Sequence, residues 1–313
     1  MAKSNMPAVR HLRYEVTNSG TAGTETSHYV DIARDLAAIN RRMMPQGRVY
    51  HVSKITVVSR NTRFNPEGAG EATGFISVSV APNSWAVRGA VKYGKELFDK
   101  MNKKATEASS GSKPGRYADF KIRGLHGGAT SPTFLVPLDN GGNSLSLGEW
   151  DYSQFISPDG TTGADSYFCH LLGPHAGSSG SFTSIGLVES YGRNRVTVAA
   201  NVPGQPTDTD DDPLANLFDA GTQHDEIIDQ IEQDNDNPPY DRLNYGGDGS
   251  NMPRPLVVQH GTLGEDGRVT LGGFAAVAGL MEFEVKSPIA NDVYSILVEL
   301  KAGSFKGIAA EAL

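Results

Sequence analysis

Cysteine, histidine and serine are the residue types best suited to nucleophilic catalysis, and this sequence combines them in few ways. Cys169 and His170 are neighbours in a predicted strand, where successive side chains point to opposite faces, so they cannot pair as thiolate and imidazole. The G-x-S-x-G motif of hydrolases is absent, since residues 177–181 read GSSGS. A phosphate-binding loop of the form G-x-x-x-x-G-K-[ST] is absent too. These residues predict a protein that is not an enzyme, with Cys169 in the core.

Aspartates in the acidic stretch are the one candidate for a metal site. Asp208, Asp210 and Asp212 alternate, and Asp219 lies near the spacing of a calcium-binding loop. However, Pro213 stands where such a loop needs glycine. A calcium contact between subunits stays open beside a solvated acidic loop, and no other cofactor is predicted. The eight histidines show no H-x-x-x-H or H-x-H pair that would indicate zinc.

Basic residues offer the remaining chemistry, which is contact with phosphate. They cluster before the first strand and at the ends of the two predicted helices. Basic residues at the C-terminal end of a helix interact favourably with the helix dipole, which is a structural role. They could also bind the phosphates of nucleic acid without sequence specificity. We therefore treat eight residues as candidates to face a genome: Lys3, Arg10, Arg13, Arg41, Arg42, Lys100, Lys103 and Lys104.

Charge is divided unevenly along the chain of 313 residues, whose net charge is −8. Residues 1–125 carry a net +10 and residues 126–313 a net −18. Residues 208–241 alone hold twelve acidic residues and no lysine or arginine. The two halves could face different partners, attract one another between copies of the chain, or neutralise each other within one globule. We expect residues 203–245 to form an acidic surface insertion, kept away from any nucleic acid.

The elements that must position these residues are mostly strands, because the chain has 36 glycines and only 20% charged residues. A first helix is predicted over residues 29–43, with Asp31, Arg34 and Asp35 away from its apolar stripe. A second helix is expected to begin after an N-cap at Ser84. No stretch is long and apolar enough for a transmembrane helix.

The sequence predicts an all-β protein with minor helices. We expect a single eight-stranded antiparallel jelly roll with long loops, and the alternative is a double jelly roll. One domain would span residues 1–313, with an N-terminal arm at residues 1–10. The core strands are predicted near residues 10–17, 49–60, 73–81, 148–157, 166–173, 184–193, 254–263 and 292–302.

A series of short motifs gives the chain a resemblance to a known family. In chain order they are Asp31-Ile-Ala-Arg-Asp-Leu, Ile39-Asn-Arg-Arg, Gln46-Gly, Tyr50-His-Val, Pro82-Asn-Ser-Trp, Gly148-Glu-Trp-Asp-Tyr-Ser, Asn237-Pro-Pro-Tyr-Asp and Gly303-Ser-Phe-Lys-Gly-Ile-Ala-Ala. Together they resemble capsid proteins of small circular single-stranded DNA viruses of environmental and marine type. The resemblance spans nearly the whole chain.

The resemblance implies a jelly-roll subunit of the virion that assembles with copies of itself into an icosahedral shell around a circular single-stranded DNA genome. It would contact the DNA through phosphates, and a host receptor would be a further partner. Unlike many small-virus capsid proteins, this chain lacks a long arginine- and lysine-rich arm, which puts strong condensation of DNA in doubt.

Three alternatives remain open from the sequence. One is a double-jelly-roll capsid protein of a membrane-containing phage. Another is a carbohydrate-binding β-sandwich, which would use exposed aromatic residues such as Trp85, Trp150, Tyr152, Tyr240 and Tyr245. The third is a jelly-roll enzyme built on the aspartates at positions 208–212.

Overall fold

The computed structural model describes residues 8–59, 74–109, 113, 115, 117–127, 133–158, 164–178, 181–193, 255–264 and 266–313. Within these residues, strands form three sheets and helices are few, so the predicted all-β class with minor helices is confirmed. The candidates Lys3, Asp208, Asp210 and Asp212, and the predicted insertion at residues 203–245, lie outside the described residues.

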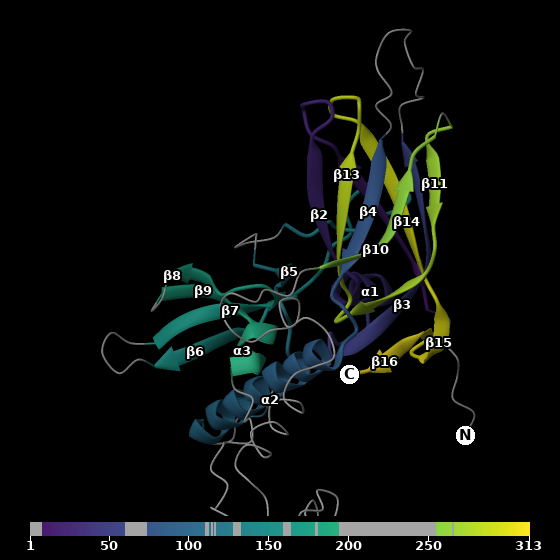
Figure 1. Cartoon of the computed structure of the whole chain (residues 1–313). Helices are drawn as coiled ribbons and strands as arrows, with labels where there is room; N and C mark the ends of the chain where they lie inside the picture. Colours follow the sequence, from purple (N-terminus) through teal and green to yellow (C-terminus); the bar gives the residue numbers. More distant parts are fainter. Residues whose placement is uncertain are drawn as a thin grey trace, which may run out of the picture.

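Two antiparallel sheets pack face to face and form a sandwich (Figure 1). The first runs in the order β1, β14, β3, β11, and β12 and β16 also pair with β3. The second runs in the order β10, β4, β13, β2. The bounds are β1 His11–Thr17, β2 Glu25–Asp31, β3 Arg48–Ser59, β4 Phe75–Val80, β10 Leu256–Thr262, β11 Arg268–Leu271, β12 Phe274–Val277, β13 Leu280–Lys286, β14 Val293–Leu300 and β16 Ala310–Ala312; β15, Ala302–Phe305, precedes β16.

Alternating side chains explain why these segments are strands with one buried face. In β1, Leu12, Tyr14 and Val16 are buried, while the residues between them face outward. The same alternation runs through β14 and β13, whose inward residues meet those of β3 and β4 in one hydrophobic core. Burial of this continuous apolar layer is what holds the two sheets together.

A third sheet lies beside the sandwich and is built from the long connection between β4 and β10 (Figure 1). Its order is β5, β7, β9, β8, and β6 pairs with β7. Its strands are β5 Gly124–His126, β6 Gln154–Pro158, β7 Ala164–Leu172, β8 Ala176–Ser178 and β9 Ser181–Gly186. The pairs of β7 with β5 and with β9 are parallel, unlike any pair in the sandwich.

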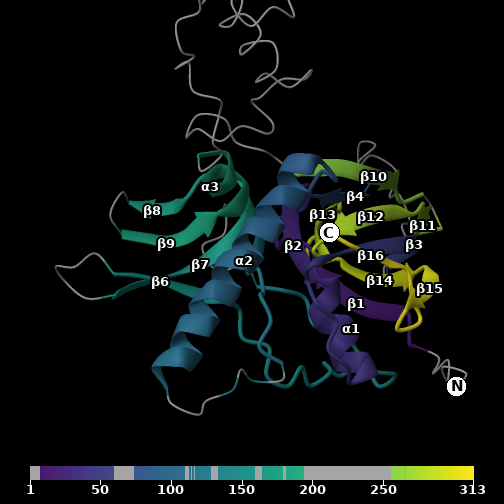
Figure 2. The same cartoon turned by 90° about the horizontal axis from the view of Figure 1, so that it is seen from below.

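Three helices occur in the described residues, all in connections between strands: α1 Ile32–Asn40, α2 Trp85–Ala108 and α3 Leu187–Arg193. Figure 2 shows α2 running past both the third sheet and the sandwich. Its buried residues join those of the third sheet in a second hydrophobic core. The predicted cap of α2 is confirmed, because the Ser84 side chain accepts a hydrogen bond from the Val87 amide.

Three of the eight predicted core strands were placed wrongly. Residues 148–157 and 166–173 contribute β6 and β7 to the third sheet, and residues 184–193 contain the end of β9 and all of α3. The sandwich instead uses β2, β11 with β12, and β13. The local pattern of a strand is the same in either sheet, so alternation alone could not assign the partner.

The predicted first helix was also too long at its start. Tyr29 belongs to β2, where it pairs with Glu282 of β13. Asp31 ends that strand and caps α1 by accepting a hydrogen bond from the Arg34 amide. Arg34 and Asp35, expected on outer faces, are buried. The sheet therefore takes the main-chain hydrogen bonds that a helix over residues 29–31 would need.

Candidate functional site

The basic residues predicted to face a genome do not form one cluster in the described part of the chain. Arg10 and Arg13 lie at β1, and the Arg13 guanidinium lies 2.8 Å from a carboxylate oxygen of Glu15. Arg41 and Arg42 follow α1 directly. Lys100, Lys103 and Lys104 are exposed on the last turns of α2. Arg10 lies near the end of α1, because the Asn40 side chain is hydrogen-bonded to the amide and the carbonyl of Val9, whereas the three lysines lie apart on α2.

The arginines at the end of α1 line a pocket. A pocket of about 340 Å³ there is lined by Arg41 and Arg42 and by Tyr117, Lys121 and Trp150 from the segments before and after β5. Figure 2 shows α1 at the edge of the sandwich, with the trace of the inserted segment passing its end. We call this hollow the α1 pocket. Lys121, Tyr117 and Trp150 were not among the predicted basic contacts, because only the fold brings them to the two arginines.

Lys121 sets the electrostatics of the α1 pocket. Its ammonium lies 5.3 Å from the Trp150 ring, and it donates long hydrogen bonds to the carbonyls of Tyr117 and Asp119. No carboxylate in the described chain forms an ion pair with it, and burial lowers its pKa. The pocket therefore contains a partly desolvated cation that the nearby carboxylates of Asp119, Asp151 and Asp31 stabilise without a direct ion pair.

A buried polar network lies beneath the α1 pocket, at the junction of β2 and α1. Its first half surrounds Asp35: the Tyr14 hydroxyl donates to one carboxylate oxygen at 2.6 Å, and the Arg34 guanidinium donates to the other at 2.8 Å. Arg34 also donates to the Leu135 carbonyl and lies over the Phe134 ring. Burial raises the pKa of Asp35 to about 6 despite these partners.

The second half of the network surrounds Asp31. Its carboxylate accepts hydrogen bonds from the Arg34 amide at 3.1 Å, from Gln46 at 2.8 Å and from the Tyr152 hydroxyl at 3.3 Å. The Gln46 side chain also donates to the carbonyl of Ile122 and accepts from its amide. Burial raises the pKa of Asp31 to about 7. The network thus ties the inserted segment to the sandwich.

Ser184 and His170 form a pair that resembles part of a hydrolase site in its hydrogen bonds. The ring nitrogens of His170 lie 2.8 Å from the Ser184 hydroxyl oxygen and 2.9 Å from the Pro174 carbonyl oxygen. Burial lowers the pKa of His170 to about 4, so the ring is neutral near pH 7. His170 and Ser184 are only 3% and 5% exposed, so the pair lies in the packed interior.

Cys169 lies in the second hydrophobic core, as the sequence predicted. Its neighbour His170 is hydrogen-bonded to Ser184 and Pro174 instead. Burial raises the pKa of its thiol to about 12 from an ordinary value of 9.0. This shift lowers the thiolate fraction about 1,000-fold at neutral pH. We expect a thiol-specific reagent to label Cys169 at least this much more slowly in the folded chain than in denaturant. Equal labelling rates in the two states would contradict the buried position.

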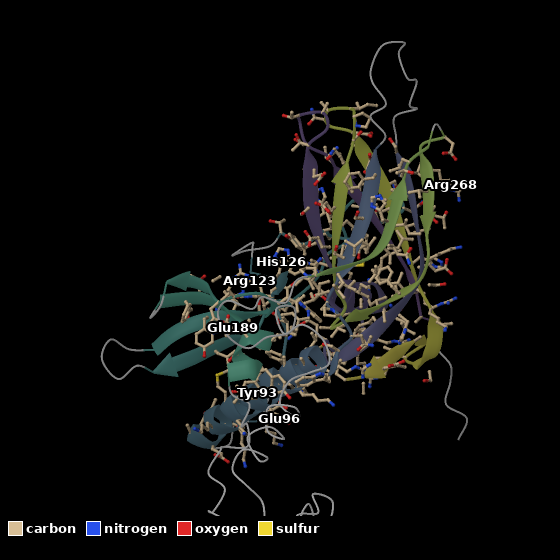
Figure 3. The ribbon with its side chains drawn as sticks, in the orientation of Figure 1. Tyr93, Glu96, Arg123, His126, Glu189 and Arg268 are labelled. Atoms are coloured by element: carbon tan, nitrogen blue, oxygen red, sulfur yellow. The ribbon has the colours of Figure 1, made fainter. Side chains whose placement is uncertain are left out.

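His126 joins the third sheet to the sandwich. Its Nε2 lies 3.1 Å from the Tyr29 hydroxyl and 3.3 Å from a carboxylate oxygen of Glu282. Burial is the largest single influence and favours the neutral form of Glu282, but the hydrogen bonds from His126, Ser27 and Tyr29 together with the His126 charge outweigh it and lower the pKa of the carboxyl. Figure 3 shows His126 and Arg123 where the third sheet meets the sandwich. The side chains of Tyr29, His126 and Glu282 therefore hold β5 against β2 and β13.

Among the described residues, no group of three histidine, cysteine or acidic side chains is arranged to hold a metal ion. The described helices include none with the length and hydropathy to cross a membrane.

Comparison with known proteins gives no match: no protein-family model, no curated protein and no solved structure is similar to this chain.

Proposed function

We propose that this chain is a viral capsid subunit that assembles with copies of itself into an icosahedral shell around a circular single-stranded DNA genome. The order of the sandwich strands carries the proposal. Counted along the chain, with β11 and β12 as one strand, the eight strands run 1-8-3-6 in one sheet and 5-4-7-2 in the other. With β16 set aside, this order supports a single jelly roll, an architecture found in viral capsids and also in lectins and cupins.

The positions of the resemblance motifs support the capsid reading over the other jelly-roll proteins. Asp31 to Leu36, Gln46 and Tyr152 come from three motifs, of which the last is 121 residues from Asp31, and they meet in this buried network. Residues of separate motifs thus share one buried junction, and this supports treating the motifs as a connected set.

The aromatic residues favour the capsid reading over a carbohydrate-binding module. Sugar binding needs aromatic rings side by side on an open surface. Trp85 is exposed, but Trp150 and Tyr152 are partly buried, and the Tyr152 ring is stacked on Phe134. Tyr240 and Tyr245 lie outside the described residues.

A single jelly roll also fits the described chain better than a double one. The inserted unit is a five-stranded sheet with parallel pairs and two covering helices, rather than a second antiparallel sandwich. This favours the small-virus reading over the capsid protein of a membrane-containing phage.

Exposed apolar residues on an edge strand suit contact with a second copy. Leu256 and Val257 of β10 are 45% and 61% exposed, and β10 is the last strand of its sheet. Leu256 also lines a hollow of about 340 Å³ with the segment that leads into α2. An exposed apolar edge strand promotes aggregation of a monomer, and in an assembling subunit it can form the contact with the next copy.

Sedimentation velocity tests the proposal on the purified full-length chain. We expect a narrow, fast boundary from particles of many subunits in at least one condition of salt, pH or calcium, in addition to the 33.4 kDa subunit. DNA inside these particles should resist nuclease. A chain that sediments only as a subunit or small oligomer under all conditions would contradict the proposal.

A further inference from the structure

The α1 pocket has the composition of a binding site for one nucleotide of an unpaired strand. Arg41, Arg42 and Lys121 supply three cations against one carboxylate, that of Glu149, and Tyr117 and Trp150 supply aromatic rings. The remaining wall is apolar. Phosphate needs the cations and a base needs the rings, so this combination suits a ligand that has both.

Two of the cations are available for an anionic ligand. Arg41 is exposed and has no hydrogen bond or ion pair to a side chain among the described residues. The backbone of Arg41 is left-handed, with φ of 51°, and ends α1 at this residue. Lys121 is held over the Trp150 ring by two carbonyls and lacks a carboxylate partner in the described chain.

The two aromatic residues of the pocket, Tyr117 and Trp150, each have an unusual environment. Tyr117 is 63% exposed, although large apolar rings are normally more covered. The Trp150 ring nitrogen is buried without an acceptor among the described residues. A buried donor without a partner carries a free-energy cost in the free protein.

We propose that the α1 pocket binds a single nucleotide unit of single-stranded DNA, with Arg41 and Lys121 at the phosphate and the exposed Tyr117 ring against the base, beside Trp150. The volume of about 340 Å³ is at the lower end for ligand sites, which suits one nucleotide and not a duplex. This inference rests on the proposed function, because it names where the genome touches the subunit.

The chain provides its own reporter for a test. It contains two tryptophans, and Trp85 lies at the start of α2, so Trp85→Phe leaves Trp150 as the only fluorescent indole. Stacking of a base in the pocket should quench Trp150. We expect saturable quenching when this variant, kept as dissociated subunits, is titrated with oligothymidylate, and weaker quenching with inorganic phosphate as the only ligand.

Two variants with the same loss of charge separate the pocket from general electrostatics. R41Q with R42Q should weaken oligothymidylate binding about tenfold or more, because the phosphate contact is lost. K100Q with K104Q removes two exposed cations of α2 and should change the affinity less than about twofold. Thermal unfolding of both variants checks that each is folded.

An absence of quenching in the folded Trp85→Phe variant would overturn the inference, as would an equal loss of affinity in the two double variants. These outcomes are distinct from failure of the proposed function. Subunits that bind the strand but never assemble would contradict the shell and leave the pocket standing, and shells whose subunits show no quenching would do the reverse.

Discussion

Replacing Arg34 by methionine should lower the free energy of unfolding by about 3–5 kcal/mol at pH 8. Methionine keeps most of the apolar stem but leaves the Asp35 carboxylate without its guanidinium partner at 2.8 Å. The cost should be smaller at pH 5. Without the cation, the already raised pKa of Asp35 rises further, so the folded variant takes up a proton at low pH and loses stability as the pH increases. Urea unfolding at the two pH values measures both effects.

Arg13→Met is the matched control for this prediction. Arg13 and Glu15 form an ion pair with the same 2.8 Å separation, but the Arg13 side chain is 37% exposed whereas that of Arg34 is 8% exposed. Solvent screens the exposed pair, so its loss should cost about 0–1 kcal/mol. Similar costs for the two variants, or a cost for Arg34→Met that does not depend on pH, would contradict a buried, charge-paired network.

Gly186→Ala should destabilise the third sheet by about 3 kcal/mol. A methyl group at this position would lie 2.2 Å from the Gly173 carbonyl oxygen and 3.2 Å from the His170 ring nitrogen. The carbonyl belongs to the main chain and cannot move aside as a flexible side chain could. Because Gly186 ends β9 immediately before α3, the strain should separate β9 from β7. Hydrogen exchange of the β7 and β9 amides measures this directly.

Gly20→Ala is the control for the glycine variant. Its added methyl group would lie 3.6 Å from the Asn291 side chain, which is an ordinary contact, and the expected change is below about 0.5 kcal/mol. If Gly186→Ala changes the stability as little as Gly20→Ala does, Gly186 does not lie as close to the Gly173 carbonyl as the structure places it.

The sequence predicted those strands whose side chains alternate clearly between buried and exposed. β1 and β14 have this pattern, and β3 has it in part. β4, which is buried after its first residue, and β10, which has no buried residue, also lie close to their predicted positions, but their β-branched composition was the signal there. β2 was missed because Glu25 to Ser27 are polar and resemble a linker, and because its last residues share the spacing of the helix that follows. Only its pairing with β13, more than 250 residues away, makes it a strand.

The candidate site could be predicted only in part. Arg41 and Arg42 were identified by their charge, but the residues that turn them into a pocket come from positions 117–150 and have no local signal of proximity. Arg34 and Asp35 were placed on outer faces because charged residues are normally exposed. A charged pair next to an aspartate N-cap, followed by glutamine before a strand, is the pattern that could have suggested a buried network.

Negative-stain electron microscopy of the purified full-length chain tests whether the chain assembles into closed shells. Samples should cover low and high salt, acidic and neutral pH, and the presence and absence of calcium. The proposed function predicts uniform closed shells of one or a few diameters in at least one condition. Finding only dispersed subunits, small oligomers or irregular aggregates in every condition would contradict it.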